Sequence, residues 1–114
     1  MEDCLFCKFV SGEIKPDVVY DDEHVLAFRD LNPQAPTHVL IVPKEHTRDA
    51  TTIQPGHGPM LAALFAAGHA IAQQEGIVES GYRMVANVGP DAGQSVYHLH
   101  VHLLGGRPMA WPPG

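Results

Sequence analysis

The sequence has little positive charge and lacks any long hydrophobic run. Lys and Arg together number 7 against 13 Asp and Glu, which gives a formal net charge of −6. A protein that binds a nucleic-acid polymer needs a broad cationic surface, so we expect no nucleic-acid partner. No apolar run approaches the roughly 20 residues of a membrane-spanning helix, and the first residues carry no secretion-signal pattern. We therefore also expect no membrane association.

Cysteine is scarce, and its placement bears on the cellular compartment. The chain has two cysteines, Cys4 and Cys7, separated by two residues. A disulfide across so short a loop would restrict the unfolded chain little, so a disulfide-stabilised secreted protein is not expected. We expect a reducing, cytoplasmic location, in which the pair is either reduced or bound to a metal.

Histidine, in contrast, is abundant. The 114 residues are expected to form one domain over 1–114, and they include 8 histidines, more than the 7 Lys and Arg together. Imidazole titrates near neutral pH, ligates metals and transfers protons. This composition directs attention to metal binding, acid–base catalysis and phosphoryl chemistry.

Hydrophobic periodicity, glycine and proline divide the chain into about five strands and two helices. Gly12 ends a short helix over 5–11, and Gly76 ends a long helix that begins at Pro59. Strands are expected over residues 18–20, 24–29, 38–42, 82–87 and 96–104. This succession predicts an α+β domain with an antiparallel sheet.

The last expected strand carries three histidines at every second position. Side chains alternate between the faces of a strand, so His98, His100 and His102 are expected on one face. A metal site and nucleophilic catalysis by an imidazole nitrogen both remain possible. The outer two histidines are about 13 Å apart along a strand, which disfavours one ion for all three. The preceding glycine-rich loop, Gly89–Ser95, can bring backbone N–H groups to an anion, which favours the nucleophile.

The segment Tyr97–Leu104 resembles the His-x-His-x-His signature of the histidine triad (HIT) family of nucleotide hydrolases and transferases. Further segments resemble the Hint branch of that family in the same order: Asp30–His38, Val42–His46, Gly81–Val85, Gly93–Tyr97 and Trp111–Gly114. The resemblance implies a HIT fold, a homodimer and hydrolysis of purine nucleoside 5′-phosphoramidates. Dinucleotide polyphosphate hydrolysis, nucleotidyl transfer and nucleotide binding with incidental activity are the alternatives.

The resemblance assigns catalytic roles to five positions. His100 matches the nucleophile that attacks the α-phosphorus and forms a nucleotidyl-histidine. One nitrogen of its ring must be held as a hydrogen-bond donor, by a backbone carbonyl in our interpretation, so that the other carries the attacking lone pair. His98 and His102 match the flanking triad members, and His38 matches a fourth histidine near the site. Ser95 matches a residue that contacts the phosphate and the leaving group.

Nucleotide-binding positions also follow from the resemblance. Asp30 matches the carboxylate that accepts hydrogen bonds from the ribose hydroxyls. The apolar slot around the purine corresponds to Phe6, Phe9, Ile14, Phe28 and Leu31, although Phe28 is equally well explained by core packing. The phosphate-side contacts correspond to Asn87, Gly93, Gln94, Ser95, His100 and His102. Apolar walls accept any purine, so adenosine and guanosine are not distinguished.

A structural zinc ion is expected, and no cofactor for catalysis. Tetrahedral zinc needs four ligands, of which Cys4 and Cys7 supply two. In family members that carry this pair, the histidine of a Pro-Lys-x-His segment and the first triad histidine complete the site; here these are His46 and His98. The alternative is a pair of reduced, packed thiols.

In the family that this sequence resembles, the C-terminal tail crosses the dimer. The resemblance therefore implies that Trp111 lies near the leaving group in the partner's active site.

Overall fold

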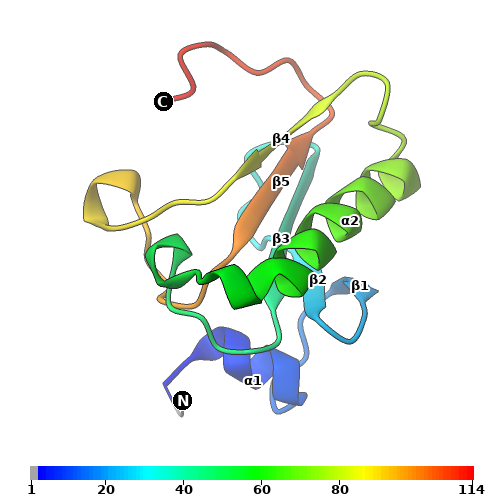
Figure 1. Cartoon of the computed structure of the whole chain (residues 1–114). Coiled ribbons are helices and arrows are strands. Elements are labelled where there is room, and N and C mark those ends of the chain that lie inside the picture. The colour runs from blue at the N-terminus through cyan, green and yellow to red at the C-terminus, as the bar shows by residue number, and fades with distance from the viewer. Residues whose placement is uncertain (1–2) are drawn as a thin grey trace.

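The computed structural model describes residues 3–114, and its centre is one antiparallel sheet (Figure 1). The strands are β1 (Val18–Asp21), β2 (Val25–Arg29), β3 (Thr37–Pro43), β4 (Tyr82–Val85) and β5 (Val101–Gly105). Their order in the sheet is β1-β2-β3-β5-β4, and every neighbouring pair is antiparallel. The predicted α+β class with five strands is therefore confirmed.

Two α-helices flank the sheet, α1 (Leu5–Ser11) and α2 (Gly58–Glu75). Short 3-10 turns at Ala50–Thr52 and Pro55–His57 precede α2, and a third at Pro90–Ala92 lies between β4 and β5. Cys4 caps the start of α1, because its sulfur accepts a hydrogen bond from the Cys7 N–H. Gly76 ends α2 in the left-handed conformation. Within residues 3–114, no helix is both long and apolar enough to cross a membrane.

The strand side chains divide into two hydrophobic clusters, one on each face of the sheet. Val25, Ala27, Val39 and Ile41 belong to the larger cluster, which includes the buried side of α2. The alternate residues Leu26, Phe28, Leu40 and Val42 form the second cluster around Phe6 of α1. In the β3–β5 register, Leu40 lies opposite His102. The second face therefore carries the histidines as well as α1.

The expected strand over 96–104 is wrong at both ends. Residues 96–98 are bends, and β5 begins only at Val101 and continues to Gly105. The segment leaves the sheet because the Leu99 N–H donates to the carbonyl of Thr47, in the irregular chain that follows β3. Inward alternation of apolar side chains nevertheless persists, since Leu99 belongs to the same cluster as Val101. The strand expected over 82–87 also stops early, at Val85.

Gly106 terminates β5 in a conformation that disfavours other residues. Its φ is +88°, and an added Cβ would lie 2.9 Å from Cβ of Pro36. We expect Gly106→Ala to lower the free energy of unfolding by about 1–3 kcal/mol, measured by urea denaturation. Gly56→Ala is the control, because no heavy atom lies within 4 Å of its added Cβ. Equal losses in the two variants would contradict the argument.

Candidate active site and metal centre

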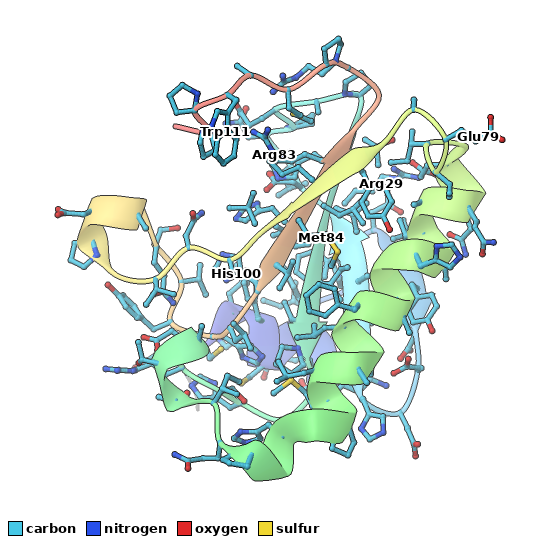
Figure 2. The ribbon with its side chains drawn as sticks, turned by 45° about the horizontal axis from the view of Figure 1, so that its top comes forward. Arg29, Glu79, Arg83, Met84, His100 and Trp111 are labelled. Atoms are coloured by element: carbon cyan, nitrogen blue, oxygen red, sulfur yellow. The ribbon has the colours of Figure 1, made fainter. Side chains whose placement is uncertain are left out.

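His100 is buried just before β5 (Figure 2), and one of its ring nitrogens is fixed as a donor. Its Nδ1 lies 2.8 Å from the backbone carbonyl oxygen of His98. A carbonyl only accepts hydrogen bonds, so Nδ1 carries the proton and Nε2 of the neutral ring carries the lone pair. Phe6 packs edge-on against the ring, with centroids 5.2 Å apart. His100 thus has the tautomer and the fixed orientation that a nucleophile needs.

A second hydrogen-bond chain fixes the tautomers of His38 and His102. The Gln34 N–H donates to His38 Nδ1 over 3.0 Å, so the proton of a neutral His38 is on Nε2. That Nε2 lies 2.9 Å from His102 Nδ1, which therefore accepts, and His102 retains its own proton on Nε2. The carboxylate of Asp30 lies 3.4 Å from the same His38 nitrogen. His102 is left with an N–H donor on the opposite side of its ring.

Burial keeps these two histidines neutral. Burial, with smaller contributions from His100 and His38, lowers the pKa of His102 to about 4. Burial also lowers the pKa of His38, and the nearby charge of Asp30 opposes that shift only in part. Near pH 7 both rings are therefore uncharged, as the hydrogen-bond chain requires.

The low pKa of His102 predicts that the fold is destabilised by acid. Its ordinary pKa is 6.5 and its folded pKa is about 4, so between these values the unfolded chain binds more protons. The stability that the neutral His102 contributes is therefore fully present above pH 6.5 and is lost as the pH is lowered toward 4. The free energy of unfolding should fall by at most about 1.4 kcal/mol per pH unit for this one proton. Urea denaturation at several pH values measures this slope.

His102→Gln removes the titrating group and should reduce the slope, whereas His69→Gln, at an exposed position of α2, should leave it as in the wild type. A wild-type stability that does not change over this pH range would contradict the neutral state of His102.

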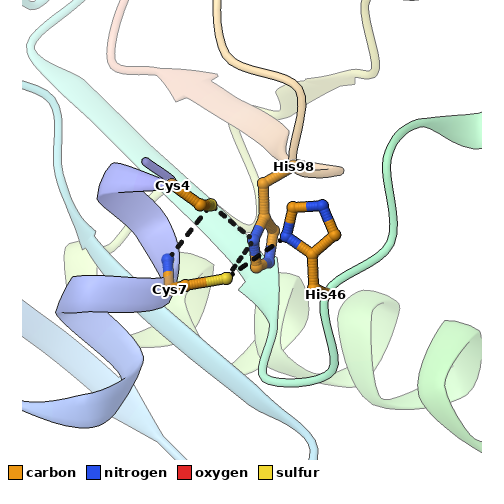
Figure 3. A group of neighbouring side chains, drawn as sticks. All are labelled: Cys4, Cys7, His46 and His98. Atoms are coloured by element: carbon orange, nitrogen blue, oxygen red, sulfur yellow. Dashed lines mark hydrogen bonds between the residues drawn. The ribbon is translucent and has the colours of Figure 1, made fainter. Parts of the chain in front are cut away.

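Two cysteines and two histidines gather at the start of α1 (Figure 3). The candidate ligand atoms of Cys4, Cys7, His46 and His98 all lie within 4.8 Å of one another. His46 Nδ1 is 3.2 Å from the sulfur of Cys7, and His98 Nδ1 is 3.3 Å from that of Cys4. The cluster joins the start of α1, the chain after β3 and the segment before β5, which are distant in the sequence.

The donor chemistry of this cluster fits a zinc ion. His98 Nε2 lies 2.8 Å from the carbonyl oxygen of Pro43 and must donate to it, so the lone pair on Nδ1 faces the sulfurs. Burial, followed by the neighbouring Cys4, raises the pKa of Cys7 to about 11. A bound cation would favour the thiolate of Cys7, which is the form that ligates a metal. Two sulfurs and two imidazole nitrogens are a common tetrahedral zinc set.

Asp30, His38 and His102 also come close enough together to be considered as metal ligands. The hydrogen bonds argue against this interpretation. The atom that His38 would offer is Nε2, yet the Gln34 N–H directed at Nδ1 requires the proton to be on Nε2. His38 and His102 therefore form a hydrogen-bonded pair with the Asp30 carboxylate beside it, and the cysteine-containing cluster is the metal candidate.

An apolar cavity of about 360 Å³ opens between α1 and β2, within the size range of small-molecule sites. Six of the residues expected to bind the nucleoside line it: Phe6, Phe9, Ile14, Phe28, Asp30 and Leu31. Leu31 is 98% exposed at its edge. Phe28 is also part of the core cluster, so both explanations of that residue hold structurally. Nucleotide binding by the six residues stays a prediction.

Four of the expected phosphate-side residues lie in the loop after β4: Asn87, Gly93, Gln94 and Ser95. The buried Gln94 side chain holds this loop together, because its amide donates to the carbonyls of Arg48 and Val96 and accepts from the Gly89 N–H. Its polar groups are therefore already engaged. Ser95 is exposed and lines a separate, open cavity of about 800 Å³ beside Cys4 and His46. Asn87 and Gly93 line neither of the two cavities in the described chain.

Several backbone groups, not apparent from the sequence, complete the site. The carbonyls of Pro43 and His98 and the N–H of Gln34 fix the tautomers described above. Pro43 and Gln34 lie within segments that resemble the family. The type of a residue, however, does not indicate whether its main-chain N–H or carbonyl group faces a histidine ring. No signal in the sequence would have identified them.

The C-terminal tail is attached to the rest of the domain in part by Arg83 of β4. Its guanidinium donates to the carbonyl of Ala110 over 3.0 Å, and Arg107 donates to the carbonyl of Gln34 over 3.1 Å. Between these anchors and the C-terminus, Trp111 is 83% exposed (Figure 2). The tail is thus fixed in place while its aromatic ring remains available.

Comparison with known proteins gives consistent matches over nearly the whole chain. Residues 11–109 match the HIT domain family. The chain is 54% identical over 114 residues to a 14 kDa zinc-binding protein of Zea mays, covering 96% of this chain and 87% of that protein. It is 45% identical over 108 residues to the purine nucleoside phosphoramidase of Escherichia coli strain K12, covering 95% and 91%. The crystal structure of a HIT family hydrolase from Legionella pneumophila Philadelphia 1 superimposes with a TM-score of 0.96 at 51% identity, covering 98% and 100%.

Proposed function

Since the chain belongs to the HIT domain family, whose matched relatives include hydrolases, we propose that it hydrolyses the P–N bond of purine nucleoside 5′-phosphoramidates. The observation that carries the proposal is the hydrogen bond from His100 Nδ1 to the His98 carbonyl, because it leaves a lone pair on Nε2. The name of the Escherichia coli relative supports the choice of substrate class.

In the proposed first step, His100 Nε2 attacks the α-phosphorus and a new N–P bond forms as the P–N bond to the amine breaks. The ring becomes positively charged, and the His98 carbonyl stabilises that charge through the Nδ1 proton. Ser95 and the Nε2–H of His102 are the proposed donors to the phosphate and the departing amine. Water then cleaves the nucleotidyl-histidine, which releases the nucleoside monophosphate and regenerates His100.

The apolar cavity beside α1 is the proposed purine site. Phe6 lines it and also contacts the His100 ring, so a base in the cavity would lie next to the nucleophile. Asp30 lines the same cavity and has one carboxylate oxygen on the Asn32 N–H. Its remaining acceptor capacity suits ribose hydroxyls.

Steady-state kinetics on two substrates test the proposed function. An AMP-amine phosphoramidate should have a kcat/KM well above that of a diadenosine polyphosphate. Preferential cleavage of the polyphosphate would instead assign the site to dinucleotide hydrolysis. Tight AMP binding with negligible turnover of both substrates would assign it to nucleotide binding alone.

We further propose that Cys4, Cys7, His46 and His98 hold a structural zinc ion. The fit of the donor set and the name of the Zea mays relative support this assignment. Bound zinc supplies a cross-link between α1 and the segment before β5, and His100 carries out the chemistry without it. Both cysteines are free in the structure, which suits the reducing cytoplasm in which we place the protein.

A homodimer formed through β4 is the proposed assembly. β4 is an edge strand, so its outer backbone groups are free to pair with a second copy. In such a dimer the anchored tail would present Trp111 to the partner's leaving group. We expect Trp111→Ala to change the ranking of phosphoramidates with different amines while AMP affinity stays within about twofold. Equal effects on all amines in parallel kinetic assays would count against this role.

A further inference from the structure

We propose that Cys4 and Cys7 form an oxidation site, at which a peroxide converts the thiol pair to a disulfide, releases the metal and slows hydrolysis. The inference rests on the proposed zinc site and the proposed nucleophile. It goes beyond both, because it makes the catalytic rate depend on the redox state of residues that do not touch the substrate.

The pair is accessible and close enough to react. Both cysteines are free and half-buried, and their sulfurs lie within 4.8 Å of each other. Cys4 lines the open cavity of about 800 Å³, together with His46 and Ser95. Cys7 does not line it. We therefore assign Cys4, which lines the cavity, as the thiol that reacts with the peroxide and Cys7 as the resolving thiol.

The chemistry balances with one peroxide for each disulfide. The Cys4 thiolate attacks one peroxide oxygen, the O–O bond breaks, and a sulfenic acid and hydroxide result. The sulfur of Cys7 then displaces the sulfenic oxygen and forms the S–S bond. In total, two thiolates, one hydrogen peroxide and two protons give one disulfide and two waters. The two electrons come from the two sulfurs, and both sulfurs cease to be charged metal ligands.

Oxidation of the two cysteines is expected to affect His100 through His98. The His98 ring faces Cys4 and Cys7, whereas its backbone carbonyl accepts the Nδ1 proton of His100. Residues 98–100 precede β5 and lack strand pairing of their own. Loss of the sulfur ligands removes the attachment of the His98 ring to the start of α1, while the hydrogen bonds of His98 to Pro43 and of Leu99 to Thr47 remain. The orientation of His100 then becomes less well defined, and a small displacement of a nucleophile reduces its rate strongly.

Nucleotide binding should be affected less than turnover. The cavity proposed for the purine is lined by Phe6, Phe9 and Phe28 of the second hydrophobic cluster and does not include Cys4 or Cys7. Oxidation is therefore expected to lower kcat more than it raises KM. A general loss of folding would change both constants together.

The test exposes the full-length, zinc-loaded protein to hydrogen peroxide and follows three quantities in the same samples. A thiol reagent counts free cysteines, a chromogenic chelator detects released zinc, and hydrolysis of an AMP-amine phosphoramidate gives kcat and KM. We expect both thiols to disappear together, one zinc to be released per chain, and kcat to fall by about 10- to 100-fold. Dithiothreitol with added zinc should restore all three, whereas methionine sulfoxide would persist under that treatment.

Two results would overturn the proposal. One is retention of both thiols under conditions that oxidise glutathione completely. The other is complete disulfide formation and zinc release with kcat unchanged. If the reduced protein hydrolyses no phosphoramidate, the proposed function fails, and the NMR signal of the His100 Nδ1 proton then replaces kcat. Loss of that signal on oxidation would support the coupling, and its persistence would reject it.

Discussion

Replacing His100 with alanine should abolish phosphoramidate turnover and leave AMP binding measurable. We expect kcat to fall by about 10⁴-fold or more, because a covalent pathway cannot proceed without its nucleophile. The ring also packs against Phe6, so a modest change in affinity is expected. Neither His38 nor His102 can take its place, because their mutual hydrogen bond engages His102 Nδ1 and leaves the other His102 nitrogen protonated.

Quenched-flow kinetics and calorimetric AMP titration measure the two effects separately. Rapid quenching with denaturant should trap a nucleotidyl-protein in the wild type and none in the variant. His69→Ala is the matched control, since it removes an exposed imidazole of α2. Turnover by the His100 variant within tenfold of the wild type would reject the assignment of the nucleophile.

Removing one sulfur of the metal centre should have the second largest effect. We expect Cys4→Ser to reduce the zinc content from about one ion per chain to a small fraction. A ligand at 1,000 times its Kd contributes about 4 kcal/mol to stability. For a domain of this size, its loss corresponds to a fall in Tm of about 10–20 °C.

Serine at position 4 limits the effect of the substitution to the loss of the metal ligand. It is itself a good helix cap, so the hydrogen bond from the Cys7 N–H to residue 4 can persist. A loss of stability then reports the missing sulfur and not an uncapped α1. Ser11→Ala, at the exposed end of the same helix, is the control. Elemental analysis with thermal denaturation measures both effects, and an equally stable, metal-free wild type would exclude the zinc site.

The sequence predicted the parts of the fold that local pattern determines. The long helix ends at Gly76 and the buried run over 38–42 forms the central β3, because turn chemistry and hydrophobic periodicity specify both. The histidine segment was predicted less well. Its alternation is typical of a strand over 96–104, yet the Leu99 N–H pairs with Thr47 and the His98 ring with Pro43. Such long-range hydrogen bonds leave no periodic signal.

The candidate site divides in the same way. Residue types and spacing indicated which imidazoles and thiols belong together, and the structure brings Cys4 to within 3.3 Å of His98 across 94 positions. The backbone-carbonyl acceptor that we expected for His100 is present as the carbonyl of His98. Which nitrogen it engages could not be predicted, nor could the proton positions of His38 and His98, since these depend on main-chain atoms of Gln34 and Pro43. The structure adds a role for Gln94 that the sequence did not indicate, because its side chain holds its own loop. Its phosphate contact stays a prediction.

The attachment of the tail suggests a route to enzyme engineering. Arg107 and Arg83 hold it through the main-chain oxygens of Gln34 and Ala110, which every amino acid provides. The side chain at position 111 can therefore be varied in a substitution library without removing either attachment. A selection on such a library would change amine preference while the imidazole chemistry of the core remains untouched.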